Sequence, residues 1–293
     1  MMSKRINYWV CDNSYNTGEG RLASFFLQDL KKNYKIKKIK QTYKNAVINH
    51  RYISPFVGIF YCWIYYLKNK KVCYINYLPL WNFLIFLLLP PRTIIGPITG
   101  GAQFVDESFF IRSYLFPIFY KISEIIINKR NYNIIFATEL LKNYLSKKTK
   151  KKSIFNYIVK KFNYKNKNKK KNIDFIVYYR VHKNKKSLFP YKFIHNLIAA
   201  KFKIIIIGDK LKHKKVINYG NISNYNLTKL QAKAKYTIAS AENIYSLFTL
   251  ECITHNMKII IDKKNKSKIR FYKSSFLKIN FENTKELNKI KFI

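Results

Sequence analysis

Residues 236–261 read YTIASAENIYSLFTLECITHNMKIII, the pattern of a strand, a turn, a helix and a second strand. YTIAS is rich in β-branched and aromatic residues, and KIII is a continuous apolar run, as in strands that are buried on both faces. Between them, Leu247, Leu250 and Ile253 recur at helical spacing. Because two strands joined through a helix lie parallel in one sheet, this stretch predicts an α/β domain.

The same alternation extends back to residue 173. Strand and helix patterns follow one another there, in the order IDFIVYY, FPYKFIHNLIAA, KFKIIIIGD, VINYG and NYNLTKLQAKA. Strands that alternate with helices predict a doubly wound parallel sheet over residues 173–293. In such sheets ligands bind beside the carboxyl ends of the strands, so we expect the functional site at that edge.

The N-terminal half predicts a second α/β domain, over residues 1–155. It contains the loop DNSYNTGEG, the helix pattern RLASFFLQDL and the strand patterns RINYWVC, KVCYIN, RTIIG and NIIFAT. The lysine–asparagine runs KKTKKKS (147–153) and KFNYKNKNKKKN (161–172) cannot bury apolar area and read as solvated segments between the halves. We therefore expect a basic linker at 156–172, between two domains.

The chain is strongly basic. Its 293 residues include 57 Lys and Arg against 14 Asp and Glu, for a formal charge of +43, while 48% hydrophobic residues supply enough material for a core. This charge predicts attraction to phosphates, whether in nucleic acid, anionic lipid or a nucleotide. Lys, Asn, Ile and Tyr crowd every segment, however, so a genome-wide nucleotide bias explains the charge more simply than a selected basic surface does.

Cysteine and histidine spacing predicts no metal site. The cysteines form no CxxC pair, which fits a reducing cytosol, and the five histidines form no HxxxH or HxxE group that could begin a zinc site. The apolar stretch at the N-terminus breaks at Asp12, which is too early for a signal peptide. We expect a cytoplasmic protein.

A long uncharged stretch, Tyr52 to Leu67, raises the question of a membrane. It contains Pro55 and Gly58 and is shorter than the roughly 20 apolar residues that a transmembrane helix needs. We expect a buried core helix, and contact with a membrane surface is the alternative.

Two cations follow the first strand of the C-terminal half. Arg180 stands at the carboxyl end of IDFIVYY, and Lys185 lies five residues later, in the loop that enters the next helix. A guanidinium and an ammonium at this edge could bind a diphosphate and stabilise the charge of a leaving group. Because lysine fills most loops of this chain, the signal rests mainly on the rarer Arg180.

The turn of the opening stretch supplies the matching groups. Residues 242–246 lead into a helix whose first backbone N–H groups, near Tyr245, Ser246 and Leu247, could bind an anion. Glu251 lies about one and a half turns into that helix, where a carboxylate can accept the paired hydroxyls of a ribose. Glu242, on the loop, could contact a sugar. The alternative is that both acids only complement the helix dipole.

This order of residues resembles the donor-binding half of GT-B glycosyltransferases, particularly glycosyltransferase family 4 (glycosyl transferases group 1). The resemblance implies two Rossmann-like, doubly wound domains that face each other across a cleft. It also implies that Arg180 and Lys185 contact the diphosphate, that Glu242 lies near the transferred sugar, and that Glu251 binds ribose.

The sequence departs from that family in two ways. Eight residues separate Glu242 from Glu251, where the family motif has seven, so strict spacing would put Asn243 in the place of the first acid. Glu242 and Asn243 therefore share the catalytic assignment. None of the five histidines matches the one that many relatives carry after an early strand of the first domain.

Two N-terminal stretches resemble loops of the same family. SYNTGEGRLASFFLQDL is similar to its first glycine loop and helix, which brings Gly18, Glu19 and Gly20 to the acceptor side or the cleft. RTIIGPITGGA (92–102) is similar to a GP-x-x-GG loop and adds its last residues, Thr99, Gly100 and Gly101. An ordinary turn is the alternative for the two adjacent glycines.

These observations together predict a metal-independent glycosyltransferase. The resemblance implies transfer from a nucleotide-diphosphate sugar, with no other cofactor, to a surface glycan or lipid-linked acceptor in polysaccharide or lipopolysaccharide biosynthesis. We expect peripheral contact with the anionic inner face of the cell membrane and no nucleic-acid partner.

Two rivals stay open. One is a non-catalytic nucleic-acid-binding protein, because 24 Tyr and 23 Phe in a basic chain could stack on bases. The other is a degenerate GT-B fold that acts only at a membrane surface.

Overall fold

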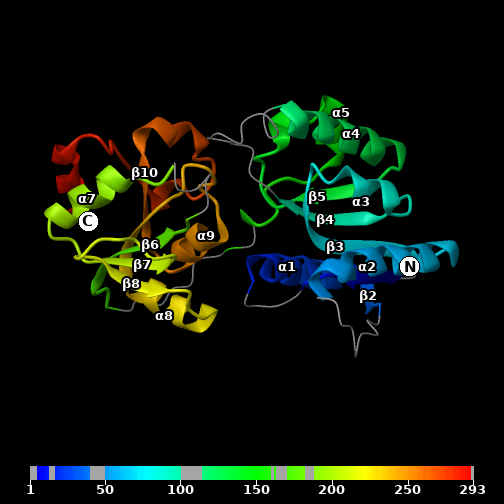
Figure 1. Ribbon diagram of the computed structural model, residues 1–293, viewed down its shortest axis with the longest axis horizontal. Helices are drawn as coiled ribbons and strands as arrows, with labels where there is room; N and C mark the ends of the chain where they lie inside the picture. Colours follow the sequence, from blue (N-terminus) through cyan, green and yellow to red (C-terminus); the bar gives the residue numbers. More distant parts are fainter. Residues whose placement is uncertain are drawn as a thin grey trace. The chain divides into compact units, whose positions relative to one another are not determined.

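The structure is a computed structural model that describes residues 5–12, 17–39, 50–99, 114–159, 162, 170–181 and 188–291. The chain forms two compact units (Figure 1). Unit 1 holds the described residues between 5 and 159, and unit 2 holds those between 162 and 291. Each unit is an α/β domain around one parallel sheet.

The sheet of unit 1 has five strands in the order β2-β1-β3-β4-β5. Every pair is parallel. The strands are β1 (Arg5–Val10), β2 (Lys35–Lys38), β3 (Lys71–Pro79), β4 (Ile94–Thr99) and β5 (Asn133–Phe136). The helices are α1 (Gly18–Asn33), α2 (His50–Leu67), α3 (Phe83–Leu88), α4 (Phe116–Lys129) and α5 (Lys147–Lys152), with a 3-10 turn η2 (Lys142–Tyr144).

Successive residues of the strands in unit 1 serve two cores. Tyr74 of β3 belongs to a cluster with α2, α3 and α4, whereas its neighbours Cys73 and Ile75 belong to a cluster with α1. A β-carbon on Gly58 of α2 would lie 2.3 Å from Nε1 of Trp9 in β1, so the helix backbone rests directly on the indole. One face of the sheet therefore carries α1, and the other carries α2, α3 and α4.

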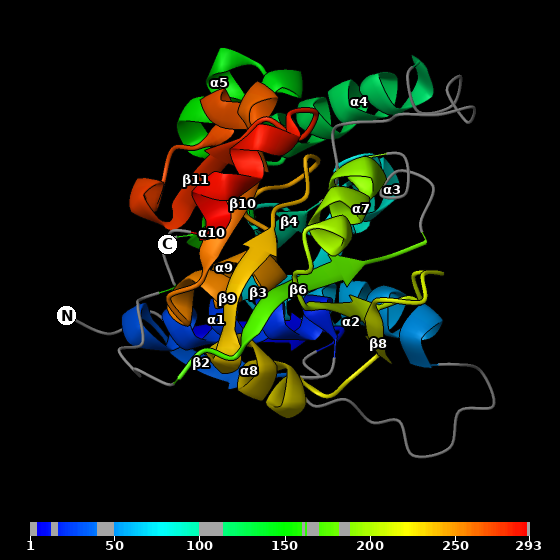
Figure 2. The ribbon, with the colours of Figure 1, turned by 90° about the vertical axis from the view of Figure 1, so that its left-hand side faces the viewer.

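The sheet of unit 2 has six strands in the order β11-β10-β9-β6-β7-β8, and every pair is again parallel (Figure 2). The strands are β6 (Ile173–Tyr179), β7 (Ile204–Gly208), β8 (Ile217–Gly220), β9 (Ala234–Ile238), β10 (Lys258–Asp262) and β11 (Phe276–Ile279). The helices are α7 (Tyr191–Ala199), α8 (Asn224–Lys233), α9 (Leu247–Thr254) and α10 (Asn288–Lys291), with 3-10 turns η4 (Lys263–Lys268), η5 (Lys273–Ser275) and η6 (Thr284–Leu287).

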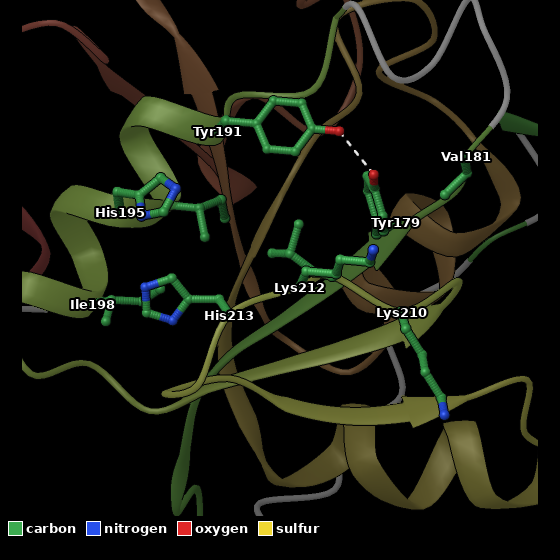
Figure 3. A pocket seen from close by; sticks show the side chains of 10 residues that line it. Tyr179, Val181, Tyr191, His195, Ile198, Lys210, Lys212 and His213 are labelled. Atoms are coloured by element: carbon green, nitrogen blue, oxygen red, sulfur yellow. Dashed lines mark hydrogen bonds between the residues drawn. The ribbon is translucent and has the colours of Figure 1, made fainter.

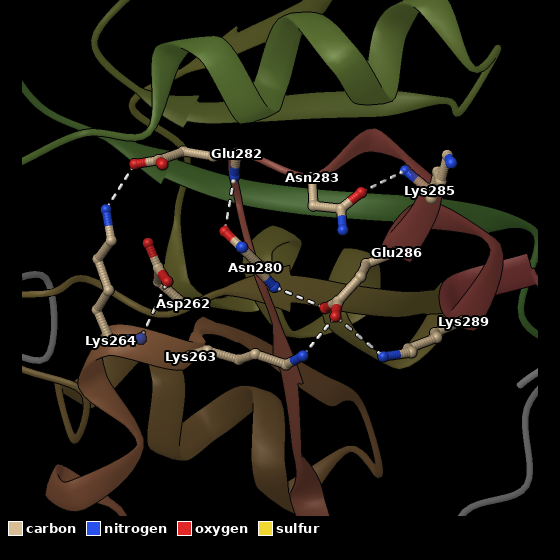
Figure 4. A network of polar contacts seen from close by, with 9 residues as sticks. All are labelled: Asp262, Lys263, Lys264, Asn280, Glu282, Asn283, Lys285, Glu286 and Lys289. Carbon is tan, nitrogen blue, oxygen red and sulfur yellow. Dashed lines mark hydrogen bonds and ion pairs between the residues drawn. The ribbon is translucent and has the colours of Figure 1, made fainter.

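The C-terminal segment completes the core of unit 2. Phe281 stacks on Phe193 of α7 at 4.0 Å between ring centroids, and the Tyr236 hydroxyl of β9 donates 2.7 Å to the carbonyl of Ile290. Beyond β11, Glu286 joins the cluster of charged contacts in Figure 4 that holds the 3-10 turns together. The segment after β10 is thus part of the domain rather than a loose end.

The prediction of two parallel-sheet domains is confirmed, but local details differ. Strands β2 and β11 were not predicted from the sequence, and KKTKKK, predicted to be part of a solvated run between the halves, is helix α5 with Thr149 buried. Ser146 caps that helix by accepting from the Thr149 N–H. The stretch 156–159, predicted to begin the linker, packs in unit 1, where the Tyr157 hydroxyl donates 2.7 Å to the Asp29 carboxylate.

The uncharged stretch 52–67 lies in helix α2, but only one face of this helix is buried. Ile59 and Cys62 lie in the core, whereas Phe56, Phe60 and Leu67 are exposed, so the prediction of a buried core helix holds for one face of α2 and not for the other. Among the described residues, none of the helices combines the length and apolar character needed to cross a bilayer.

Candidate functional site

The loop that carries Arg180 is fixed to its neighbour. Arg180 follows the last residue of β6, and the Asp209 N–H, directly after β7, donates 3.0 Å to the carbonyl of Tyr179. The Asp209 carboxylate accepts a 2.6 Å hydrogen bond from the N–H of Val181. Two hydrogen bonds between neighbouring strand ends therefore hold the backbone on both sides of Arg180.

Gly208 makes this connection sterically feasible. Its φ is 98°, and a β-carbon there would lie 2.4 Å from the carbonyl oxygen of Tyr179. Only glycine adopts this conformation readily and leaves the space that the approach requires. The chain thus places a glycine exactly where β7 must turn beside the end of β6.

The turn after β9 is organised by Asn243. Its Oδ1 accepts 3.2 Å from the N–H of Tyr245, and its carbonyl accepts 3.2 Å from the N–H of Ser246. This is the Asx-turn arrangement typical of asparagine before a helix. The amide oxygen of Asn243 therefore stabilises the turn that follows Glu242.

A second segment clamps the same turn. The Tyr245 hydroxyl accepts 2.8 Å from the N–H of both Arg270 and Phe271 and donates 3.1 Å to the carbonyl of Phe271. The Lys268 ammonium donates 2.6 Å to the carbonyl of Ala241, and burial lowers the pKa of Lys268. The turn after β9 is therefore anchored at two points: Tyr245 binds the backbone of residues 270–271, and Lys268 binds the carbonyl of Ala241.

Helix α9 begins directly after this turn. Ser246 caps it by accepting from the Thr249 N–H at 3.2 Å. Glu251 is the fifth residue of α9, is half-buried, and has its Oε2 atom out of contact with solvent. A carboxylate in this position presents acceptor oxygens close to the N-terminal turn of the helix.

The structure brings the predicted donor-side residues to adjacent strands. β6, which precedes Arg180, pairs with β9, which precedes Glu242, Asn243 and α9. Lys185 lies outside the described residues. The predicted anion contact of Tyr245 and Ser246 through backbone N–H groups is wrong in one respect, because both groups already donate to Asn243.

Other backbone N–H groups at the start of α9 can still bind an anion. The N–H groups of Leu247 and Phe248 belong to the first turn of α9, where the helix itself offers no acceptor. The positive end of the helix dipole adds to their attraction for an anion. Leu247 thus keeps its predicted position, whereas Phe248 is an addition.

In unit 1 the predicted residues lie at the start of α1 and at the end of β4. Gly18, Glu19 and Gly20 are not a loop, as the sequence suggests, but the first turn of α1. Thr17 caps this turn by accepting 2.9 Å from the Gly20 N–H, and its own hydroxyl donates 2.7 Å to Asp12, just after β1. Thr99 is the last residue of β4, while Gly100 and Gly101 lie outside the described residues.

A cavity of about 410 Å³ lies beside α7 (Figure 3). At its wall the hydroxyls of Tyr179 and Tyr191 are 2.8 Å apart, and burial together with this contact raises the pKa of Tyr191. His195 and His213 meet edge to face at 5.1 Å between centroids.

Within the described part of the chain, no three His, Cys, Asp or Glu side chains are grouped as a metal site requires.

Sequence reasoning missed Asp209, Lys268 and this cavity. Asp209 was visible as the polar residue that ends KFKIIIIGD, but its role depends on a contact with a neighbouring strand. Lys268 carries no local signal, because it stands among many lysines. The cavity requires the fold, since its walls come from β6, α7 and the connection after β7.

No family model matches the sequence, and no curated protein matches it. Solved structures do match in shape. A glycosyltransferase from Rickettsia africae ESF-5 is 14% identical, with a TM-score of 0.54 over 100% of this chain and 88% of that chain. Anabaena HepE, in complex with UDP and glucose, is 8% identical, with a TM-score of 0.55 over 99% and 89%.

A putative UDP-N-acetylglucosamine 2-epimerase from Listeria monocytogenes is similar to the same degree, with 8% identity and a TM-score of 0.51 over 100% of this chain and 88% of that chain. At these sequence identities the matches establish the fold alone, and the activity must be argued from the residues of the site. Two α/β units with parallel sheets, matched over nearly the whole chain, show that this protein has a GT-B glycosyltransferase-like fold.

Proposed function

We propose that the protein is a glycosyltransferase that uses a nucleotide-diphosphate sugar. The observation that carries the proposal is the pairing of β6 with β9, which brings the end that bears Arg180 next to the turn and helix that bear Glu242 and Glu251. Ligands of parallel sheets bind at this edge. A cation beside two acids and a helix N-terminus suits a diphosphate joined to two sugars.

Each group has a proposed part in binding the donor. Arg180 and Lys185 contact the diphosphate, together with the N–H groups of Leu247 and Phe248 at the start of α9. Glu251 accepts the ribose hydroxyls, because its depth in α9 matches the distance from a phosphate at the helix end to the sugar beyond it. Tyr245 and Ser246 support this site by shaping the turn.

Between the two candidates for the sugar contact, we favour Glu242. The Asn243 side chain already accepts from the Tyr245 N–H, which ties its amide to the turn. Glu242 precedes that turn and offers a carboxylate to the hydroxyls of the transferred sugar. The extra residue between the two acids is then absorbed by the Asx-turn.

The chemical step follows from these charges. As the bond from the sugar to the diphosphate breaks, positive charge develops on the ring and negative charge on the leaving group. Arg180 and the α9 N-terminus stabilise the leaving group, so protein cations rather than a metal ion carry this role. Glu242 lies where it can stabilise the charge on the ring.

The acceptor side of the proposal rests on unit 1. Gly18, Glu19 and Gly20 begin α1, the helix after β1, and Thr99 ends β4 of the same parallel sheet. Gly100 and Gly101 come next in the sequence and lie outside the described residues. The carboxyl edge of that sheet is the ligand-binding edge of the unit. A surface glycan or lipid-linked saccharide is the proposed acceptor.

Product analysis tests this function. The purified protein is incubated with UDP-, GDP-, dTDP- and CMP-sugars, and the products are separated by chromatography. Release of a nucleoside diphosphate from a UDP-, GDP- or dTDP-sugar, lost in Arg180→Ala and retained in Lys214→Ala, supports glycosyl transfer, whereas CMP-sugars, which carry a single phosphate, should not react. Conversion to an epimeric sugar would assign the fold to the epimerase chemistry instead, and no product from any donor would remove the proposal.

A further inference from the structure

The outward face of α2 is apolar along its length. Phe56, Phe60 and Leu67 are 62, 63 and 73% exposed and follow one another at four- and seven-residue spacing, on the side of the helix away from the buried Cys62. A helix on the surface of a soluble domain normally turns charged residues to that side. The stretch from 52 to 67 contains none.

The neighbouring helices continue this surface. Leu84 and Leu87 of α3 and Ile118 and Ile125 of α4 are also exposed, each opposite the buried side of its helix. The three helices are joined, because Trp63 Nε1 of α2 donates 2.7 Å to the carbonyl of Leu88, and Trp81 before α3 stacks on Phe116 of α4. We call these seven exposed residues the apolar layer: Phe56, Phe60, Leu67, Leu84, Leu87, Ile118 and Ile125. The exposed Lys121 and Lys129 lie on the same side of α4 as its two isoleucines.

A basic cavity lies at the end of the apolar layer. Its volume is about 580 Å³, and it lies where α2 ends at Leu67 and where β3, β4 and β5 begin. Lys70, Lys71 and Arg92 line it together with asparagines, and no acid occurs among the described residues of its wall. It occupies the amino edge of the sheet, opposite to the carboxyl edge where Thr99 lies.

Two helix ends shape this cavity. The backbone beyond α2 turns at Asn69, with a φ of 54°, and the backbone beyond α4 turns at Asn131, with a φ of 52°. The Arg92 N–H donates a 2.9 Å hydrogen bond to the carbonyl of Arg130. This contact fixes the loop before β4 against the loop before β5. The cations therefore stand on loops that are tied to the sheet.

We propose that this face of unit 1 binds the surface of a bilayer that contains anionic phospholipid. The apolar layer enters the boundary between head groups and acyl chains, and the basic cavity receives a phosphate head group. Apolar patches of this extent mark interaction sites, and helices that lie in a bilayer interface combine such a face with lysines at its borders. Lys121 and Lys129, exposed on α4, can extend toward the head groups.

Charge complementarity selects the bilayer over a protein partner. A protein interface that covered the apolar layer would need an acidic partner exactly at the cavity, whereas an anionic leaflet supplies phosphates all around the apolar residues. The proposal goes beyond the glycosyltransferase activity and does not rest on it, because the surface and the candidate donor site are in different units.

Vesicle flotation tests the proposal with four double variants of the full chain. Phe60→Ser with Leu84→Ser removes apolar area from the layer, and Lys70→Gln with Lys71→Gln removes charge from the cavity. The matched controls are in unit 2: Ile217→Ser with Tyr219→Ser, which are also exposed, and Lys214→Gln with Lys215→Gln. Vesicles are phosphatidylcholine alone or phosphatidylcholine with phosphatidylglycerol, and circular dichroism checks the folding of each variant.

The wild type and both controls are expected to float with the vesicles that contain phosphatidylglycerol, within about twofold of one another. Each lysine near an anionic leaflet contributes roughly fivefold to partitioning, so the cavity variant, which removes two lysines, should lose about 25-fold. The apolar variant should lose at least as much. Equal binding by all variants would overturn the proposal, as would equal losses in the two charge variants, which would reveal attraction by net charge alone. If the protein does not float with vesicles but self-associates through the apolar layer, the proposal is overturned, and the partner of this surface is a second copy of the chain.

Discussion

The carboxylate of Asp209 accepts a 2.6 Å hydrogen bond from the backbone N–H of Val181, the residue that follows Arg180. This contact couples the carboxyl ends of β6 and β7. Because Arg180 lies between Val181 and the last residue of β6, its backbone is held in place by this acidic neighbour. The candidate donor site is therefore supported by its neighbour in the sheet.

Removal of the Asp209 carboxylate should loosen this loop. Asp209→Ala leaves the Val181 N–H without its acceptor, and a hydrogen bond to a charged group contributes about 1.5–3 kcal/mol, less where solvent reaches it. We expect donor affinity to fall by several fold, with most of the fold stability retained. Asp209→Asn, which keeps one acceptor oxygen, should lose less. Titration calorimetry with the preferred nucleotide measures the effect, and equal affinities for all three proteins would contradict the role.

Two glycines with positive φ provide a matched pair. Gly208→Ala places a β-carbon 2.4 Å from the Tyr179 carbonyl, whereas the described residues leave no heavy atom within 4 Å of a β-carbon at Gly220. A left-handed backbone alone costs about 1 kcal/mol for alanine. Urea unfolding should therefore show a loss near that size for Gly220→Ala and a clearly larger loss for Gly208→Ala. Similar losses would show that the contact with Tyr179 relaxes freely.

Gly58 of α2 should be equally sensitive to an added methyl group. A β-carbon there would lie 2.3 Å from Nε1 and 2.4 Å from Cδ1 of Trp9, which is fully buried. Overpacking of a core usually costs about 1–3 kcal/mol, which outweighs the gain in helix propensity from Gly to Ala. Gly58→Ala is expected to lower the denaturation midpoint and change tryptophan fluorescence. A stabilised protein would mean that α2 moves off the sheet without cost.

Glu286 should make unit 2 acid-sensitive. Hydrogen bonds from Lys263 and from the Asn280 N–H, which is 2.8 Å away, hold the pKa of Glu286 at about 2, below its ordinary value of 4.5. Since the folded pKa is the lower one, the stabilisation is complete above pH 4.5 and is lost as the pH falls from 4.5 toward 2. Figure 4 shows Lys289 on the same carboxylate, 3.1 Å from Oε1.

Glu286→Gln should remove part of that acid dependence and lower stability at neutral pH. Thermal melts between pH 2 and pH 7 measure both effects. Glu282→Gln is the control, since the pair of Glu282 and Lys264 is about two-thirds exposed on both sides and exposed pairs contribute little. An unchanged pH profile in Glu286→Gln, or an equal change in the control, would contradict this assignment.

Much of unit 2 could be predicted because its strands are buried on both faces. The four isoleucines at 204–207 admit no exposed side, so they mark β7 without ambiguity. β2 has the sequence KIKK and is mostly exposed at the sheet edge, where apolar periodicity gives no signal. β11 is only four residues long and follows a lysine-rich segment, which hides it in the same way.

The sites were predictable only as far as they follow strand order. Arg180, Glu242 and Glu251 could be found because a parallel sheet brings the ends of its strands to one edge. The roles of Asn243 and Asp209 could not be found, since they depend on hydrogen bonds within a turn and between loops. The apolar layer was also hidden, because residues 52–67 of α2 carry no charge and the sequence does not distinguish the core face from the exposed one.

The central claim is that the carboxyl ends of β6 and β9 together bind one nucleotide sugar. A thermal-shift panel of UDP-, GDP-, dTDP- and CMP-sugars tests this directly, because a ligand that binds the native state raises its melting temperature. We predict that one donor raises the melting temperature of the wild type and of Lys214→Ala, and that Arg180→Ala and Glu251→Gln lose the shift while melting normally without ligand. A shift of the same size in both of these variants would contradict the site, and no shift with any donor would contradict the function.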